Sequence, residues 1–371
     1  MDEKKDQRKS GLQVPIDPIT LSEVASVAKS LIKKEVWDYY DCGADSQTAP
    51  HENEAAFKVL KILPRVLRDV SSVRTKTTLF GREYPVPFGL APSAMQKLAG
   101  GEGEMDVARA AAKLGVNLTL SSQSTTSLED VMSCKESSSG GGDPAFWMQL
   151  YLTKDPEKSV PLIKRAEAAG YEALVLTVDT PSPQTDRKPT FNRRLMDARI
   201  LHDAETILSE AGGSTHSNSL TWDTTIPLMR KVAPGMKIIL KGIMTHEDAV
   251  LAVNHGADAI VVSNHGGRQL DEASSTMEAL PIIHAALATK SPEPGRRNKI
   301  PVIFDGGVRT GADVFKALAL GADFVLEGVE TVINILEREL SRTMALAGVT
   351  KIISKEYIGV KNVGGFGVSK L

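Results

Sequence analysis

The most informative part of the sequence runs Ala259-Ile260-Val261-Val262 and continues Ser263-Asn264-His265-Gly266-Gly267-Arg268-Gln269-Leu270-Asp271. Four apolar residues followed by polar and glycine residues are typical of a buried strand that opens into a loop. His265 can act as a base near neutral pH, and Arg268 carries a planar set of donors that suits a carboxylate. The stretch therefore predicts chemistry at the carboxyl end of a strand, where α/β barrels place their functional residues.

The rest of the chain carries the repeating pattern that such a barrel requires. From Val86 onward, short apolar runs alternate with amphipathic helical stretches, which indicates βα units around a parallel sheet. The eight runs predict strands at 86–91, 117–120, 145–150, 173–177, 237–241, 259–263, 301–305 and 324–327. The predicted fold class is α/β, a (β/α)8 TIM barrel with an N-terminal helical extension.

The predicted domain organisation is a single domain over residues 1–371. Residues 19–60 have apolar side chains at helical spacing and are expected to cover one barrel end, the barrel occupies 86–348, and 361–371 form a flexible tail. Two further stretches, 133–143 and 212–219, are rich in serine and glycine. The second is either a lid over the site or a solvated loop, and the sequence leaves both readings open.

Composition excludes several classes of function. A hydrophobic content of 42% with 24% charged residues is that of an ordinary globular protein, and the net charge of -2 argues against nucleic acid as a partner. The apolar runs are too short to span a bilayer, so no membrane partner is expected. Cys42 and Cys134 are the only cysteines, which fits a reducing compartment, and the polar first ten residues argue against a secretory signal peptide.

The last three residues resemble a targeting signal. Ser369-Lys370-Leu371 has the form that the peroxisomal import receptor reads, and it follows a glycine-rich stretch. We therefore expect a peroxisomal location, with the import receptor as a partner. The alternative is that a three-residue ending of this kind arose by chance.

Polar side chains gather at the ends of the predicted strands, and they come from seven separate segments. They are Ser93, Ser121, Gln149, Tyr151, Thr177, Asp179, Lys241, Ser263, His265 and Asp305. The segment Asp305-Gly306-Gly307-Val308-Arg309 follows the seventh strand, where such barrels bind phosphate with glycine amides and a cation. Because one site collects all of these ends, the pattern predicts an active site rather than independent structural residues.

The motif Ser263 to Gln269 resembles the signature of the FMN-dependent 2-hydroxy acid oxidases and dehydrogenases, the glycolate oxidase and lactate oxidase family, and the resemblance extends from Leu21 to Gly348. It implies FMN as cofactor, no metal, a homo-oligomer, and oxidation of an L-2-hydroxy acid to the 2-oxo acid by oxygen with release of hydrogen peroxide. The chain has no haem domain ahead of the barrel, and Ala94 matches oxidases rather than the monooxygenase relatives. Both features favour an oxidase.

The resemblance also implies roles for individual residues. His265 would be the base, Asp179 would orient it, Arg268 would hold the substrate carboxylate, and Tyr39 and Tyr151 would hydrogen-bond the substrate. Lys241 would stabilise the anionic reduced flavin. The implied cofactor contacts are Pro92, Ser93, Ala94, Ser121, Gln149, Thr177, Lys241, Ser263, Asp305, Gly306, Gly307, Arg309 and Gly328.

Each of these residues has another reading. Asp179 could cap a turn before Pro181, Lys241 could form a Schiff base as aldolase lysines do, and each tyrosine could be a core aromatic residue with a satisfied hydroxyl. These alternatives stay open on the sequence alone.

The chain departs from the family pattern at three places. After the eighth strand it has Gly328-Val329-Glu330, preceded by Glu327, where the family has Gly-Arg-Pro with the arginine on the FMN phosphate. Asp186, with Arg187 beside it, lies six residues before Asn192, at the place of the family arginine that grips the substrate carboxylate. Gln123 replaces the tryptophan of glycolate oxidase. These departures allow two competing functions: a catalytically silent barrel that binds a partner, or an FMN enzyme for a specialised metabolite.

Overall fold

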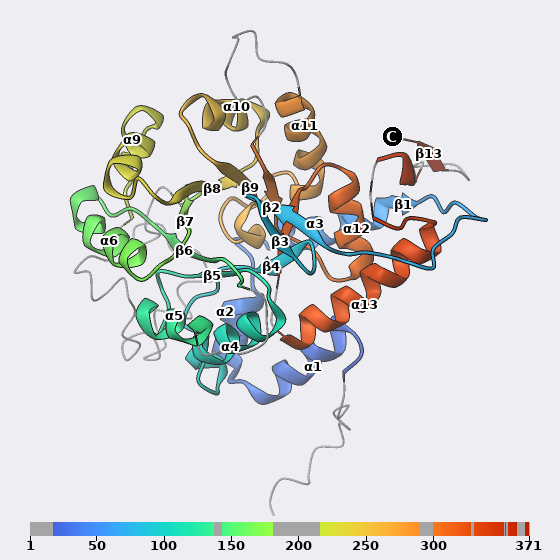
Figure 1. Ribbon diagram of the computed structural model, residues 1–371, viewed down its shortest axis with the longest axis horizontal. Coiled ribbons are helices and arrows are strands. Elements are labelled where there is room, and N and C mark those ends of the chain that lie inside the picture. The colour runs from blue at the N-terminus through green and yellow to red at the C-terminus, as the bar shows by residue number, and fades with distance from the viewer. Residues whose placement is uncertain are drawn as a thin grey trace, which may run out of the picture.

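The computed structural model describes residues 18–136, 143–180, 216–288, 300–327, 330–351, 353, 355–361 and 368–370. Within them, eight strands close into a parallel barrel (Figure 1). In order they are β4 (Phe88–Leu90), β5 (Leu118–Leu120), β6 (Phe146–Leu150), β7 (Ala173–Thr177), β8 (Lys237–Ile243), β9 (Ala259–Val262), β10 (Val302–Phe304) and β11 (Phe324–Glu327). Pairing of Val325 with Phe88 closes the barrel. Every predicted strand overlaps one of these, so the predicted fold class is confirmed.

Helices surround the barrel and cover its outer face (Figure 1). They are α4 (Glu104–Leu114), α5 (Leu128–Glu136), α6 (Val160–Ala168), α9 (Trp222–Val232), α10 (His246–Asn254), α11 (Thr276–Ala288), α12 (Gly311–Ala319) and α13 (Glu330–Ala347). Short 3-10 helices are η1 (Gln96–Ala99), η2 (Pro156–Ser159), η4 (His265–Gly267) and η5 (Lys355–Tyr357).

The two faces of each barrel strand divide the core in two. On β7, Ala173 and Val175 pack inside the barrel, whereas Leu174 and Leu176 pack in the layer beneath the helices. Since side chains alternate along a strand, Thr177 is the next inward position at the carboxyl end. The same alternation leads inward from Trp147 to Gln149 and from Ile239 to Lys241.

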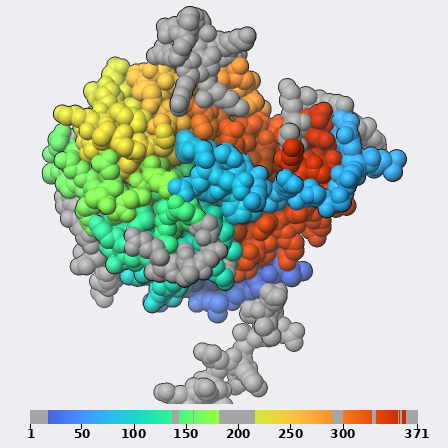
Figure 2. Space-filling model, in the orientation of Figure 1, coloured from blue at the N-terminus to red at the C-terminus, as the bar shows by residue number. Residues whose placement is uncertain are grey.

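The amino end of the barrel is closed by the hairpin of β2 (Thr77–Leu79) and β3 (Arg82–Tyr84). Figure 2 shows this hairpin segment over the middle of the face in view. The Tyr84 ring lies 5.3 Å from that of Phe324, and the Phe80 ring lies 6.1 Å from that of Trp147. The hairpin therefore seals the apolar interior, and the carboxyl end is left for the polar residues.

The predicted N-terminal helices are present as α1 (Leu21–Leu31), α2 (Lys34–Asp41) and α3 (Thr48–Val59). Helix α3 reaches the loop that follows β9. The side-chain amides of Asn53 and Asn264 bond reciprocally, at 2.8 and 2.9 Å, and Thr276 N donates to Asn53 Oδ1 at 3.2 Å. This contact holds the extension against the carboxyl end of the barrel.

The C-terminal region differs in part from the flexible tail expected over 361–371. Strand β12 (Ile358–Lys361) pairs with β1 (Leu60–Ile62), and β13 (Val368–Lys370) pairs with β12 to form a small antiparallel sheet. Residues 368–370 are therefore tied down by backbone hydrogen bonds, which a glycine-rich composition does not reveal.

Several expectations fall outside the described residues. Gly328, Val329, Asp186, Arg187 and Asn192 belong to this group, as do parts of the two serine- and glycine-rich stretches. Among the described helices, none has the length and apolarity to cross a membrane.

The Asn53 contact generates a stability prediction. Replacing Asn53, which is 1% exposed, by alanine removes the reciprocal contact with the Asn264 amide and leaves the Thr276 N–H without its acceptor. Because an unsatisfied buried polar group is costly, we expect a loss of about 1–3 kcal/mol in the free energy of unfolding by urea. His51 is exposed on the same helix, so H51A is the matched control and should leave stability unchanged. Equal stability of N53A and H51A would contradict the interpretation.

Candidate functional site

A cavity of about 410 Å³ lies at the carboxyl end of the barrel, within the size range of ligand-binding pockets. Most of the predicted site residues line it: Tyr39, Pro92, Ser93, Ala94, Ser121, Gln149, Tyr151, Thr177, Lys241, His265, Arg268, Asp305, Gly306, Gly307 and Arg309. Asp179 and Ser263 hydrogen-bond residues of the lining. The structure therefore brings together every predicted site residue that it describes.

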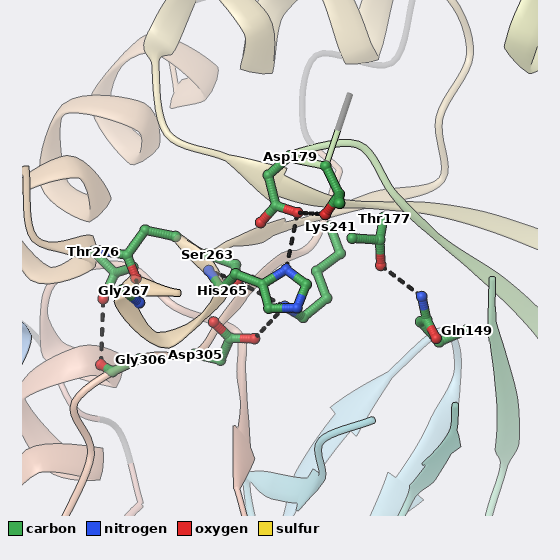
Figure 3. Close-up of polar contacts among 12 residues, drawn as sticks. Gln149, Thr177, Asp179, Lys241, Ser263, His265, Gly267, Thr276, Asp305 and Gly306 are labelled. Carbon is green, nitrogen blue, oxygen red and sulfur yellow. Dashed lines mark hydrogen bonds and ion pairs between the residues drawn. The ribbon is translucent and has the colours of Figure 1, made fainter. Parts of the chain in front are cut away.

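The histidine and the aspartate form a pair. His265 Nδ1 lies 3.0 Å from Asp179 Oδ1 (Figure 3), and the His265 backbone N–H donates to Ser263 Oγ at 3.1 Å. Because the carboxylate accepts from Nδ1–H, this contact assigns the tautomer in which Nε2 is the proton acceptor. Burial by itself would raise the pKa of the Asp179 carboxyl, but the His265 imidazole and the Lys241 ammonium hold it below its ordinary value. Asp179 therefore stays ionised beside the base.

A glycine permits this pairing. Gly242 follows Lys241 with a φ of 111°, a conformation that L side chains rarely adopt. A Cβ at this position would lie 2.7 Å from Asp179 Cβ. Strand β8 can therefore approach Asp179 closely only because residue 242 has no side chain.

Lys241 is held between two partners in the centre of the cavity wall. Its Nζ lies 3.2 Å from Asp305 Oδ2 and 2.8 Å from Ser263 Oγ (Figure 3), and the side chains of Lys241 and Asp305 are 7% and 11% exposed. Asp305 Oδ1 is buried and has no hydrogen-bond partner among the described residues. An ammonium engaged in an ion pair is a poor nucleophile, so this geometry supports a fixed positive charge rather than a Schiff base.

Aromatic rings surround Arg268 and the base. The guanidinium carbon of Arg268 lies 4.8 Å from the centroid of the Tyr39 ring. Tyr151 stacks on His216, with ring centroids 4.1 Å apart and planes 14° apart. Burial and the nearby Asp179 carboxylate raise the pKa of Tyr151, so its hydroxyl stays protonated and can donate a hydrogen bond.

The other end of the cavity suits an anion. A Cβ on Gly306 would lie 2.9 Å from Thr276 Oγ1, and one on Gly307 would lie 2.5 Å from the Asn53 carbonyl oxygen, so glycine is what allows α3 to pack there. The N–H groups of both glycines make no hydrogen bond within the described part of the chain. Arg309 lines the same end, and its Nε lies 3.0 Å from Glu54 Oε1.

These residues fit FMN. The cavity joins a phosphate-type corner, made of glycine amides and an arginine, to a wall that carries the buried Lys241 ammonium and an unpartnered Asp305 oxygen. A flavin needs this combination, since its phosphate is anionic, its ring edge both donates and accepts hydrogen bonds, and a cation favours its reduced form. The His265 and Arg268 end lies beyond this wall and is left for a substrate.

Sequence reasoning missed four residues of the site. Tyr40 lines the cavity and donates its hydroxyl hydrogen to the Ala94 carbonyl at 2.7 Å. Glu104 is buried and accepts from the backbone N–H groups of Gln96 and Thr125, which joins the loops after β4 and β5. Asn53 and His216 are the other two. The adjacent Tyr39 was a signal for Tyr40, whereas the other three act through distant contacts without a local pattern.

The chain is similar to proteins of one family over most of its length. The sequence profile of the FMN-dependent dehydrogenases matches residues 28–358. A 2-hydroxyacid oxidase of Dictyostelium discoideum is 42% identical over 357 residues, covering 90% of this chain and 88% of that protein. The peroxisomal (S)-2-hydroxyacid oxidase GLO4 of Arabidopsis thaliana is 35% identical over 93% of this chain and 97% of its own. The crystal structure of a mandelate oxidase superposes with a TM-score of 0.77 at 34% identity, covering 90% and 96% of the two chains.

The Lys241–Asp305 pair generates a second stability prediction. K241M or D305L alone leaves one buried charge without its partner, and we expect each to cost about 3–5 kcal/mol of unfolding free energy. The double variant K241M/D305L removes both charges and should cost clearly less than the sum of the two. Urea unfolding measures the unfolding free energy of all three variants. The flavin-free protein is used so that a change in cofactor affinity does not affect the measured stability. Additive costs would show that the two charges do not interact.

Proposed function

The chain belongs to the FMN-dependent dehydrogenase family, and on that premise we propose that it oxidises an L-2-hydroxy acid to the 2-oxo acid, with dioxygen as acceptor and hydrogen peroxide as the second product. One observation carries this proposal. His265 is held by Asp179 in the tautomer of a base, in the same cavity as Arg268 and Lys241.

In the proposed reaction, His265 and Asp179 have separate roles. FMN, when bound, supplies a two-electron acceptor that dioxygen can reoxidise. His265 Nε2 takes the proton of the substrate hydroxyl, and the ionised Asp179 stabilises the imidazolium that results. The α-carbon hydrogen and its bonding electron pair would pass to that two-electron acceptor while His265 holds the hydroxyl proton, so the alcohol becomes a ketone.

Substrate binding uses the residues around the base. Arg268 holds the carboxylate, since its planar donors match two carboxylate oxygens, and the Tyr39 ring fixes the guanidinium from one side. The protonated Tyr151 hydroxyl and the Tyr39 hydroxyl donate to the carboxylate and the hydroxyl of the substrate. Asp186 and Arg187 lie outside the described residues, so Arg268 carries this assignment.

The cofactor would be held along the remaining wall. Backbone groups of Pro92, Ser93 and Ala94 would lie along the ring, and Lys241 would stabilise negative charge on it. The other proposed contacts are Ser121, Gln149, Thr177, Ser263, Asp305, Gly306, Gly307, Arg309 and Gly328. The Lys241–Asp305 pair supports the role proposed for Lys241, because it keeps the ammonium fixed at the cavity.

The site and the relatives give less support to the two competing functions. A silent barrel would have no need for a partly buried, oriented His265–Asp179 pair, and the relatives of this chain are named as oxidases. A specialised substrate remains the second candidate, because Gln123 lines the cavity with an amide where glycolate oxidase has a tryptophan.

The test is a panel of short, branched and aromatic L-2-hydroxy acids with two readouts. The purified protein should show flavin absorbance, a substrate should bleach it under anaerobic conditions, and aerobic turnover should give peroxide. H265Q should lower kcat by about 100- to 10,000-fold, because it removes the general base. D179N should lower kcat too, since an amide cannot stabilise the imidazolium.

H246Q serves as the control, because His246 is half exposed at the start of α10, away from the cavity lining. It should keep full activity. If no hydroxy acid reduces bound flavin, the proposal is lost and the silent barrel replaces it. If H265Q reduces flavin as fast as the parent protein, the assignment of the base is wrong.

We also propose a peroxisomal location, with Ser369-Lys370-Leu371 as the segment that the import receptor reads. Because residues 368–370 pair with β12, the receptor would have to displace this short strand to read them. The name of the Arabidopsis relative supports it, as does the proposed release of peroxide. A fluorescent protein fused to the N-terminus should colocalise with a peroxisomal marker, and deletion of 369–371 should spread it through the cytosol. An unchanged distribution after deletion would contradict the proposal.

Self-association into a homo-oligomer belongs to the same proposal. Leu270 and Ile282 are 73% and 58% exposed, and such side chains can supply apolar contacts between subunits.

A further inference from the structure

Three carboxylates around the phosphate-type corner of the cavity are each paired with a cation. Arg309 is the cation of this corner, and the exposed Glu54 already pairs with it at 3.0 Å. Asp305 pairs with Lys241 at 3.2 Å, and Asp313 caps the start of α12 and lies 3.6 Å from the Lys316 ammonium. Each of these carboxylates therefore has a cationic neighbour.

Glu327 differs from them. It is the last residue of β11, it lines the cavity, and it makes no ion pair with any described residue. Phe324 and Leu326 of the same strand point inside the barrel, so the alternation turns Glu327 to the outer side, between the strand and the helices. The residues that follow the seventh and eighth strands of such barrels are where phosphate groups bind.

The surroundings of Glu327 favour its neutral form. Burial and the carboxyls of Asp305 and Asp313 raise its pKa to about 7, although Arg309 opposes them. The charged groups on the neighbouring elements are Arg309 and Asp305 after β10, Asp313 and Lys316 on α12, Glu54 on α3, Lys241 on β8 and Glu339 on α13, whose Oε2 accepts from Gly311 N. The carboxyl can therefore change its charge near neutral pH.

Resting on the proposed function, we propose that Glu327 makes binding of the FMN phosphate depend on a proton. In its neutral form the Glu327 carboxyl tolerates the phosphate and can donate a hydrogen bond to an anionic oxygen. In its ionised form it repels the phosphate, and one arginine that is shared with Glu54 does not offset that repulsion. The cofactor is held firmly below neutral pH and released as the pH rises.

The direction of the pH dependence follows from thermodynamic linkage between proton binding at Glu327 and binding of FMN. A bound phosphate dianion raises the pKa of Glu327 further, so binding takes up a proton whenever the free protein is ionised there. Between the pKa values of the free and the loaded protein, the dissociation constant rises by about tenfold for each pH unit. Ionisation of the phosphate itself acts in the opposite direction, but its second pKa of about 6 lies below this range.

The experiment dilutes the full-length holoenzyme into buffers from about pH 6.5 to about pH 8.5 and measures released flavin by fluorescence, above the phosphate's own titration. The dissociation constant for FMN should rise at least about tenfold over this range. Holoenzyme in which riboflavin has replaced FMN by exchange should show no comparable rise, because riboflavin has the same ring and ribityl chain without the phosphate.

E327Q keeps the size and polarity of the side chain without its charge. This variant should give an FMN dissociation constant that is flat across the range, and it should bind FMN more tightly than the parent protein at the high end. E54Q is the matched control, because it removes the exposed carboxylate that pairs with the same arginine. It should shift the dissociation constant but leave its slope with pH unchanged.

The outcomes separate two kinds of failure. A pH-independent FMN affinity, an equal slope for riboflavin, or a slope that persists in E327Q would overturn the role of Glu327 while leaving the proposed function intact. A chain that holds neither flavin at any pH would overturn the proposed function and this inference with it.

Discussion

Alternation along the strands of a closed barrel is the constraint on which the site depends. Every second side chain must enter the interior, and the hairpin of β2 and β3 seals that interior at the amino end with Tyr84 and Phe80 against Phe324 and Trp147. Most of the lower inward positions are therefore apolar. On β6, β7, β8 and β10 the last inward position, in or just after the strand, faces the open end and carries Gln149, Thr177, Lys241 and Asp305, respectively. The same geometry that packs the core also brings polar groups from distant parts of the chain to one cavity.

This regularity explains what could be predicted from the sequence. The barrel strands and the residues at their ends follow a period, and the motif around His265 fixes which end is functional. Residues that act across the molecule could not be found in this way. Asn53 is one of many polar residues on a helix until its bonds to Asn264 are seen, and Glu104 is an ordinary acidic residue until it accepts from Gln96 and Thr125. The pairing of residues 368–370 with β12 could not be predicted for a related reason, because a strand this short beside glycines shows no hydrophobic periodicity.

His216 is another residue near the site that the sequence pattern does not reveal. The backbone of His216 forms an antiparallel β-bridge with Thr153, and its ring stacks on one face of the Tyr151 ring. Burial and the nearby His265 lower the pKa of His216, so a neutral ring lies beside the proposed base. A charged ring at that position would disfavour the imidazolium that His265 must become. A neutral stacking partner fixes the tyrosine without opposing proton transfer.

Charge pairing determines what the cavity can bind. With His265 in the unprotonated form of a base, its pair with Asp179 carries one negative charge, whereas Lys241 and Asp305 sum to no net charge, so neither pair attracts an anion from water. An anionic substrate therefore requires a cation beyond these pairs, and Arg268, which lines the same cavity as His265, is the cation that we propose. Its guanidinium is held on the Tyr39 ring rather than buried, which leaves its cost of desolvation small. On the proposed function, selectivity for a carboxylate next to the reacting carbon would follow from the position of this arginine, while the two pairs would supply the base and the fixed ammonium.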